Sequence, residues 1–490
     1  MTSAIAFDNS YSRMPAGFSS AQQPTPVAQP GLIAINDALA AQLGINAEWL
    51  RSPEGLSVLA GNAIPEGATP IATVYAGHQF GSYNPQLGDG RAILLGEVVD
   101  RDGARMDVQL KGAGPTPYSR GGDGRSPIGP VVREYLISEA MHTLGVPTTR
   151  ALAAVTTGEA VVRNQMEPGA ILTRIASSHL RVGTVQFFSA SGDKDKLNAL
   201  VSHVLARHYP QHSGDNPALA LLEAVVAAQA RLIAHWQLLG FIHGVMNTDN
   251  MLLCGETVDY GPCAFMDSFH PDTVFSSIDH GGRYAYRNQP GIGHWNLSVL
   301  AQALLPVIAD DPDTAVALAQ ASVDRYPELF MEAHSQGLAT KLGLAALSEE
   351  DTEQVEALFT LMADESLDFT LTFRQLTDLT AHDEAAHGIG DLAPESARLN
   401  AWIAQWQERL AVDPQSKRDR HAAMRRANPV FIPRNHLVQE AISAAEGGDF
   451  GPFHALNTRW QQPFDYDAAD RRLATPPLPE QRVHQTFCGT

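Results

Sequence analysis

Apolar and polar positions divide the chain into a β-rich first part and a helical second part. Between residues 72 and 114, short apolar runs alternate with glycine turns, which indicates β-hairpins. Asp102-Gly103 predicts a tight turn between the strands RAILLGEVV and MDVQL. The runs ALAAVTTGEAVVR and GAILTRIA predict a second strand pair, and PVVREYLISEAMHTLGVP predicts one helix between the two pairs.

The second part of the chain follows helical periodicity. Apolar residues from Leu222 to Leu239 share one face of a long helix that we expect to end at Gly240. The segments WNLSVLAQALLPV, DTEQVEALFTLM and LNAWIAQWQERL predict further amphipathic helices. The first 30 residues, rich in Ser, Gln and Pro, are expected to form an irregular arm. The order of elements predicts an α+β fold with a cleft between two lobes.

Composition narrows the class of protein. Of the 490 residues, 44% are hydrophobic and 18% charged, which is typical of a globular chain with a large core. The formal net charge of -20 argues against a nucleic-acid partner. Three cysteines in so long a chain do not make a disulfide framework, and the start MTSAIAFDNSYSRMP lacks the pattern of a signal peptide. We therefore expect a soluble cytoplasmic protein that binds neither nucleic acid nor membranes.

The segment HGVMNTDNMLLCGETVDYG carries the most discriminating spacing in the sequence. Protein kinases use the pattern H-R-D-x-x-x-x-N followed by D-F-G, in which the Asn and the second Asp hold metal ions on the phosphates. His243 and Asn250 have that spacing, and Asp259 opens the triplet Asp-Tyr-Gly. Such oxygen ligands suit Mg²⁺ or Mn²⁺. The strand-like stretches MLL and TV predict a short hairpin between the two ligands. Read alone, this segment could also be a loop with Asn and Asp as turn residues.

Upstream residues complete a kinase-like pattern. Lys111 ends the strand MDVQLK, on the face opposite Val108 and Leu110, and Glu134 follows in the next helix. Kinases pair a strand lysine with a helix glutamate to hold the lysine on the nucleotide phosphates. Singly, these two residues would be read as a surface lysine and a solvated glutamate. Their order ahead of the His243 segment favours a nucleotide site.

Glycine turns and arginines lie in the same region. The turn that contains Gly88, Gly90 and Arg91 precedes the strand RAILLGEVV, and glycine lets backbone amides approach phosphate closely. The cluster RGGDGR at residues 120–125 lies between Lys111 and Glu134; it could equally be a solvated flexible loop. Arg174 and Arg181 complete the set of cations.

One position departs from the kinase pattern. Where kinases place the catalytic Asp, two residues after the His, this chain has Val245. Asp249, beside Asn250, is the nearby carboxylate that could take over. Either catalysis is lost or the geometry of the site has changed.

Longer stretches of the chain resemble the selenoprotein O family of protein adenylyltransferases, which have a pseudokinase fold. The matching text includes YAGHQFGSYNPQLGDGRAILLGE, QLKGAGPTPYSRGGDGRSP, HGVMNTDNMLL and NPVFIPRNHLVQEAI, and it covers about residues 75 to 440. The resemblance implies a bilobal, protein-kinase-like α+β fold. The expected division is an N-terminal extension at 1–70, a β-rich nucleotide-binding lobe at 71–180, a helical lobe with the catalytic and metal loops at 181–400, and a C-terminal helical extension with a Cys-bearing tail at 401–490.

The resemblance also implies an activity and roles for residues. ATP would lie flipped relative to a kinase, so that AMP passes to a Ser, Thr or Tyr hydroxyl of a protein substrate. Asp249 would be the proton acceptor, Glu134 would orient Lys111, and Asn250 and Asp259 would hold the metal. The nucleotide would be bound by Gly88, Gly90, Arg91, Lys111, Asp123, Gly124, Arg174 and Arg181. Transfer of the γ-phosphoryl group and a noncatalytic nucleotide-binding scaffold remain as alternatives, although Val245 argues against the first and the intact metal pair against the second.

Cys488, third from the last residue, matches a terminal Cys or Sec of the family. The resemblance implies redox control there, with Cys263 as a candidate disulfide partner. A free thiol on a mobile tail is the equal alternative, because an exposed disulfide is labile in a reducing compartment.

Overall fold

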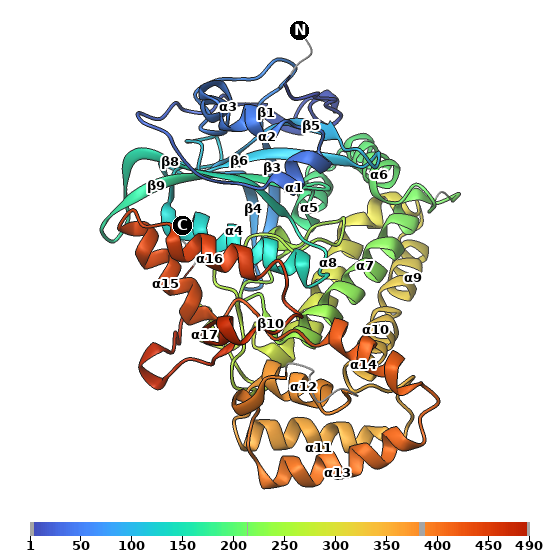
Figure 1. Ribbon diagram of the computed structural model, residues 1–490. Coiled ribbons are helices and arrows are strands. Elements are labelled where there is room, and N and C mark those ends of the chain that lie inside the picture. Colours follow the sequence, from blue (N-terminus) through green and yellow to red (C-terminus); the bar gives the residue numbers. More distant parts are fainter. Residues whose placement is uncertain (1–3, 213, 382–387, 488–490) are drawn as a thin grey trace.

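The computed structural model describes residues 4–212, 214–381 and 388–487 (Figure 1). Within these residues, one antiparallel nine-stranded sheet forms the first part of the chain, in the order β1-β3-β5-β6-β9-β8-β2, with β4 paired to β3 and β7 to β9. Its strands are β1 (Ser19–Ala21), β2 (Gly31–Ile35), β3 (Ile71–Gln79), β4 (Ser82–Gly88), β5 (Ala92–Val99), β6 (Arg105–Lys111), β7 (Ser126–Pro127), β8 (Arg150–Val162) and β9 (Met166–Ala176).

The central strands of the sheet lie where the sequence pattern predicts them. The turn at Asp102 and Gly103 joins β5 to β6, and Gly103 takes the left-handed conformation (φ 85°) that a tight turn needs. The predicted pair of β8 and β9 is also confirmed. In the sheet, Gln109 of β6 lies opposite Arg174 of β9. Because side chains alternate along a strand, Lys111 shares the face of Gln109 and Arg174.

The two faces of the sheet are covered differently. Three short helices, α1 (Asp37–Gln42), α2 (Ala47–Arg51) and α3 (Pro53–Leu59), pack with the face that carries Val108 and Leu110. Helix α4 (Ile128–Thr143) covers the other face and is almost entirely buried. The C-terminal helices α15 (Asn435–Glu446) and α16 (Gly451–Arg459) pack on α4, as Figure 1 shows in red beside cyan. The end of the chain therefore supports the helix that carries Glu134.

The first 30 residues are less irregular than predicted. Ser19–Ala21 pair with β3, and directly after the arm Gly31–Ile35 pair with β8. Tyr11 and Phe18 are buried in the core beside α5 and α7. A Ser- and Pro-rich sequence gives no strand signal, but main-chain hydrogen bonds at the sheet edges do not depend on side chains.

The second part of the chain is helical, as predicted. Helix α7 (Pro217–Leu239) crosses its core and ends at Gly240, which has φ 69°. The other helices of this part are α5 (Val182–Ala190), α6 (Lys194–His208), α8 (Gln289–Ile308), α9 (Pro312–Val323), α10 (Tyr326–Lys341), α11 (Asp351–Asp364), α12 (Phe369–Asp378), α13 (Ala397–Ala411), α14 (Lys417–Ala427) and α17 (Arg471–Ala474); β10 (Phe241–Ile242) pairs with β11 (Ala264–Phe265).

The architecture is the bilobal kinase-like α+β class expected from the sequence, whereas the exact division at residues 70, 180 and 400 stays a prediction. Two segments, Pro217–Leu239 and Tyr286–Ile308, are long and apolar enough to cross a membrane by length and composition. Of their most apolar stretches, 61% and 50% is buried inside the fold. Burial of this kind is what core helices of a soluble protein show.

Candidate active site

Four charged side chains, three from β6, α4 and β9 and one from the loop after Asn250, meet at the junction of the sheet and the helical part. Lys111 Nζ of β6 lies 2.5 Å from Glu134 Oε2 of α4, which is the predicted strand-to-helix ion pair. The same ammonium donates to Asp259 Oδ1 at 3.0 Å. Arg174 of β9 donates to Glu134 Oε1 at 3.0 Å and to Asp259 Oδ1 at 2.7 Å. Lys111, Glu134, Arg174 and Asp259 therefore form one connected cluster.

Arg181, at the start of α5, adds a third cation. It donates to Asp259 Oδ2 at 2.7 Å and also to the main-chain carbonyl of Asp249. Burial opposes ionisation of Asp259, but the charges of Lys111, Arg181 and Arg174 hold the pKa of its carboxyl group well below the ordinary value. The three cations thus favour the ionised form of Asp259. Its backbone is left-handed (φ 61°), which is uncommon for a residue other than glycine and aims the carboxylate at the three cations.

Glu134 is fixed in the same way. Burial raises the pKa of its carboxyl group, but the positive charges of Lys111 and Arg174 outweigh that effect, so the pKa lies below the ordinary value. Gln109 Oε1 accepts from Arg174 Nε at 3.1 Å and from its Nη2 at 2.7 Å. With its remaining nitrogens held by Gln109, Arg174 has a fixed orientation.

Contacts of the His243 ring hold the start of the kinase-like segment in place. The ring of His243 stacks on Trp236, and its Nε2 lies 2.9 Å from the carbonyl oxygen of Val258, one residue before Asp259. Val245, which replaces the catalytic Asp of kinases, is buried. Its carbonyl oxygen accepts from Asn250 Nδ2 at 3.0 Å. Asn250 Oδ1 is therefore the atom of that side chain that can face a cation.

The hairpin predicted between Asn250 and Asp259 is wrong. Leu252 bridges to Arg181, and Thr257 bridges to Thr148, so the two apolar stretches pair with other parts of the chain rather than with each other. Short apolar runs do not specify a partner. The two bridges nevertheless fix both ends of the segment, and they attach it to the start of α5 and to the strand region that follows α4.

Asp249 lies in the 3₁₀ turn Thr248–Asn250 and is covered by the hairpin of β3 and β4. Gln79 Nε2, at the end of β3, donates to Asp249 Oδ2 at 2.9 Å. Burial raises the pKa of Asp249, and the hydrogen bond from Gln79 and the charge of Arg181 oppose that rise only in part. A carboxylate with a raised pKa is a better proton acceptor than an ordinary aspartate.

Two more contacts from the hairpin of β3 and β4 hold the loop from His243 to Asn250, which we call the catalytic loop. His78 N donates to Thr248 Oγ1 at 2.7 Å, and Phe80 N donates to Asn247 Oδ1 at 3.1 Å. Sequence reasoning did not assign a role to Gln79, His78 or Phe80. The only signal in the sequence was their position: two polar residues and an aromatic residue stand at the tip of an apolar hairpin in YAGHQFGSY.

The glycine turns lie one strand away from the cluster and pack on each other. A Cβ at Gly88 would meet the Tyr118 ring at 2.4 Å, and one at Gly124 would meet the Gly114 backbone at 2.1 Å. Close contact between loops therefore explains these glycines without reference to a ligand. Gly90 belongs to the same packing, 3.0 Å from the Tyr118 carbonyl oxygen by the same measure. The carbonyl of Arg91 accepts from Gly112 N at 2.7 Å, which sets Arg91 beside Lys111 in the neighbouring strand.

Asp123 is engaged elsewhere. Both of its oxygens accept from Arg163, at 2.9 and 3.0 Å, and this pairing lowers the pKa of the carboxyl group. Of the residues predicted to bind nucleotide, the structure therefore joins Lys111, Arg174 and Arg181 directly, places the main chain of Arg91 beside the end of β6, and leaves Asp123 paired with Arg163.

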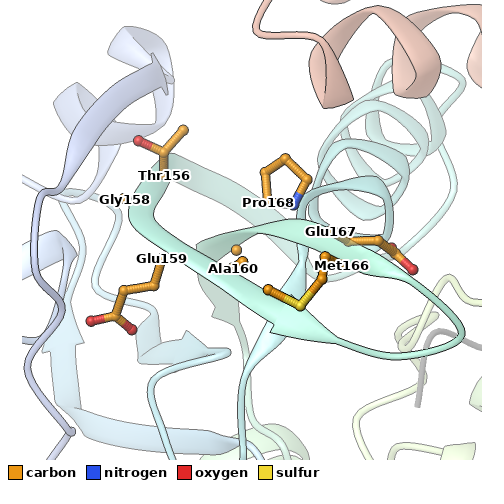
Figure 2. A pocket seen from close by; sticks show the side chains of 8 residues that line it. Thr156, Gly158, Glu159, Ala160, Met166, Glu167 and Pro168 are labelled. Carbon is orange, nitrogen blue, oxygen red and sulfur yellow. The ribbon is translucent and has the colours of Figure 1, made fainter.

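One surface hollow lies away from this cluster. It has a volume of about 380 Å³ and lies on the hairpin of β8 and β9, between Glu159, Met166 and Glu167 (Figure 2). A much smaller cavity of about 10 Å³, room for about one water molecule, lies behind the catalytic loop and is lined by Asn247, Asn250 and Glu256 among others.

A segment near the end of the chain reaches the region after Asp259. Thr486 is buried, its hydroxyl donates to the carbonyl oxygen of Pro262 at 2.5 Å, and it pairs with Ser276 in a short parallel bridge. Cys263 is buried next to Pro262. Cys488 lies outside the described residues, so its pairing with Cys263 stays a prediction.

The fold and this cluster together define a kinase-like nucleotide-transferring enzyme: a strand lysine paired with a helix glutamate, and an Asp-aromatic-Gly aspartate opposite them. The family model for protein adenylyltransferase SelO matches residues 2–461, and the chain belongs to this family. The protein nucleotidyltransferase YdiU of Rhizobium etli (strain CIAT 652) is 56% identical over 100% of this chain and 98% of its own length. The proteins of the same name from Rhodopseudomonas palustris (strain BisB5) and Bradyrhizobium sp. (strain ORS 278) are each 54% identical over the full length of both chains.

Proposed function

We propose that this protein transfers AMP from ATP to Ser, Thr or Tyr hydroxyl groups of other proteins, with release of pyrophosphate. The observation that carries the proposal is the convergence of Lys111, Arg174 and Arg181 on Asp259. Three cations face two carboxylates, Asp259 and Glu134, so the cluster carries a net positive charge, and a triphosphate would supply the missing negative charge. The names of the family and of its relatives support a nucleotidyltransferase that uses ATP and protein substrates.

The reaction joins the acceptor oxygen to the α-phosphorus and breaks the bond from that phosphorus to the bridging oxygen of pyrophosphate. Negative charge grows on the leaving pyrophosphate, so cations near the β- and γ-phosphates stabilise the transition state. Lys111, Arg174 and Arg181 would fill this role. Asp249 would accept the hydroxyl proton, and its raised pKa suits that task.

A divalent cation, Mg²⁺ or Mn²⁺, fits the donor set. Asn250 Oδ1 and the carboxylate of Asp259 are hard oxygen ligands, and the described residues contain no group of three or more His, Cys, Asp or Glu side chains that would compete for it. When bound, the cation would neutralise phosphate charge and orient the triphosphate. Both Asp259 oxygens accept from cations, so ligation would exchange at least one of those contacts for the metal.

Two further parts of the proposal concern partners. The net charge of -20 supports a protein rather than a nucleic acid as acceptor, and the burial of the two most apolar helices supports a protein that does not span a membrane. The cysteine content supports a cytoplasmic location.

The test uses ATP labelled on the α- or the γ-phosphate, with Mg²⁺ or Mn²⁺ and a cell lysate as the source of acceptors. Protein label from the α-position alone supports AMP transfer, and label from the γ-position alone would make the protein a kinase. Absence of both would indicate a noncatalytic scaffold. Asp249→Asn should keep ATP affinity and lose transfer, whereas Arg287→Ala, a surface change, should leave both intact.

A further inference from the structure

The tip of the hairpin of β3 and β4 presents aromatic side chains to solvent beside the catalytic loop. Phe80 is 37% exposed and Tyr83 is 43% exposed. The Tyr83 ring lies 5.0 Å from the ring of His78, and the His78 ring meets the edge of Trp295 at 5.4 Å. Exposed aromatic residues that gather at one place are typical of binding surfaces.

The backbone of this tip is strained. Phe80 and Gly81 both have positive φ, 51° and 84°, as a two-residue type I′ turn requires. Asn, Asp or Gly normally occupies the first of these positions, and an aromatic residue there is unfavourable. The contact of Phe80 N with Asn247 and the edge-on packing of its ring on Tyr284 at 5.1 Å hold the turn in place. Strain that neighbouring residues maintain beside an active site points to a role for the residue so displayed.

A cation lies next to the aromatic residues. The guanidinium of Arg283 stacks over the Trp295 ring at 4.9 Å and lies 3.9 Å from the place where a Cβ on Gly81 would stand. Among the residues that the structure describes, no carboxylate forms an ion pair with Arg283. Asp279, the acidic neighbour, accepts instead from the backbone N–H groups of Arg283 at 2.9 Å and Tyr284 at 2.8 Å. Arg283 can therefore bind a carboxylate from outside through its planar donors while it stays stacked.

This surface is joined directly to the proposed proton acceptor. Tyr284 OH donates to Asn247 Oδ1 at 2.5 Å, and the hairpin donates to Asp249 through Gln79. Gln79 and Asn247 thus connect this surface to the loop that carries the buried Asp249.

We infer that Phe80, Tyr83, Arg283 and Trp295 form the surface that receives the acceptor protein, and that Arg283 selects segments with an aspartate or glutamate beside the acceptor hydroxyl. The inference rests on the proposed AMP transfer for the meaning of "acceptor". It commits to an acidic segment because Arg283, which stacks on Trp295 at this surface, forms no ion pair with a described carboxylate. In a chain of net charge -20, a cation beside the catalytic loop is a local exception that would attract such a segment.

The experiment measures binding separately from chemistry. Two fluorescein-labelled peptides differ only in the residues on either side of a central serine, aspartate in one and lysine in the other. Fluorescence anisotropy gives the Kd of each for the full chain without ATP. We expect the aspartate peptide to bind about tenfold more tightly, the value for one charge-assisted contact in a partly desolvated site. Arg283→Ala should remove the difference, and Arg283→Glu should reverse it.

Two further variants guard against a change in folding. Arg287→Ala removes an exposed arginine of the same segment that is already paired with Asp272 at 2.7 Å, and it should keep the preference of the wild type. Trp295→Leu keeps every charge but loosens Arg283, and it should weaken the preference. Equal binding of both peptides, binding of neither, or a preference that survives Arg283→Glu would overturn the inference.

AMP transfer from α-labelled ATP to lysate proteins is followed with the same variants. AMP transfer without any preference for the acidic peptide would contradict the role of this surface and would still support the proposed function. A preference for the acidic peptide without AMP transfer would support the role of this surface and contradict the proposed function.

Discussion

Arg174 and Asp259 are joined at 2.7 Å, and the same guanidinium nitrogen of Arg174 lies 3.0 Å from Glu134. One arginine thereby ties strand β9, helix α4 and the proposed metal-binding residue into a single charged unit. The Arg174 side chain is 2% exposed. In such a setting each charge depends on the others, because removal of one partner leaves a buried charge uncompensated.

Asp259→Asn should lower the free energy of unfolding by about 3 kcal/mol, since Lys111, Arg174 and Arg181 lose a shared counter-charge. Urea unfolding measures the change. Asp272→Asn is the matched control: it removes an exposed carboxylate paired with one arginine and should cost less than about 1 kcal/mol. Equal losses in the two variants would mean that Asp259 does not balance the three cations.

Gln79→Leu should move the acid side of the activity profile to higher pH. The Gln79 hydrogen bond lowers the pKa of Asp249, so its removal raises that pKa further and the residue stays protonated over a wider range. Initial rates of AMP transfer between pH 5 and 9 measure the shift. At high pH, where Asp249 is ionised in both proteins, the rates should converge. A uniform loss at all pH values would assign Gln79 a purely structural role.

Glu256 should make the protein less stable as pH rises. Burial raises the pKa of this carboxyl group to about 7, above its value of 4.5 in an unfolded chain. The folded state therefore holds the proton more tightly, and the stability from this group is present at low pH and is lost as pH rises toward 7. Glu256 is only partly buried, so solvent screens part of its interactions. We therefore expect the free energy of unfolding to change by about 1 kcal/mol rather than by the full effect of the pKa shift.

Glu256→Gln provides the comparison. The amide does not titrate, so the difference in Tm between wild type and variant should favour the wild type more at pH 5 than at pH 8. A difference that does not vary with pH would show that Glu256 titrates normally in the folded protein.

Gly183→Ala should destabilise the protein by about 1–3 kcal/mol and displace the catalytic loop. A Cβ at Gly183 would lie 2.1 Å from the carbonyl oxygen of Ala76, a backbone atom that cannot move away cheaply, and it would also stand in ordinary contact with Asp249 Cα at 3.5 Å. Gly291→Ala is the control, because its Cβ would meet nothing within 4 Å and alanine favours the helix α8. Thermal unfolding and AMP transfer are measured for both; a neutral Gly183→Ala would mean that β3 and the loop can separate.

Much of the site could be predicted because its parts are local in sequence. Alternation along MDVQLK sets the face of Lys111, and the spacing from His243 to Asn250 and Asp259 lies within one short segment. The ion pair of Lys111 with Glu134 follows from the order of a strand and a helix. The family resemblance added roles to these residues, and the family itself is confirmed by the comparison.

The contacts that could not be predicted join distant parts of the chain. Gln79 and Asp249 are 170 residues apart, and no pattern in YAGHQFGSY shows that the hairpin tip folds onto the catalytic loop. The predicted hairpin after Asn250 failed for the same reason: an apolar triplet indicates burial but leaves its partner open. The tight turn at Phe80 could not be predicted, because a type I′ turn is normally recognised by Asn, Asp or Gly and the sequence has Phe-Gly there.

The contact of Thr486 with Pro262 spans 224 residues, and it supports the segment that leads to Arg283. During synthesis, the sheet and its cations are made first, and Thr486 emerges only after every helix from α8 to α17. Helices α15 and α16, which pack on α4, are made before Thr486, so the helix that carries Glu134 can gain its cover before the segment leading to Arg283 gains this last contact.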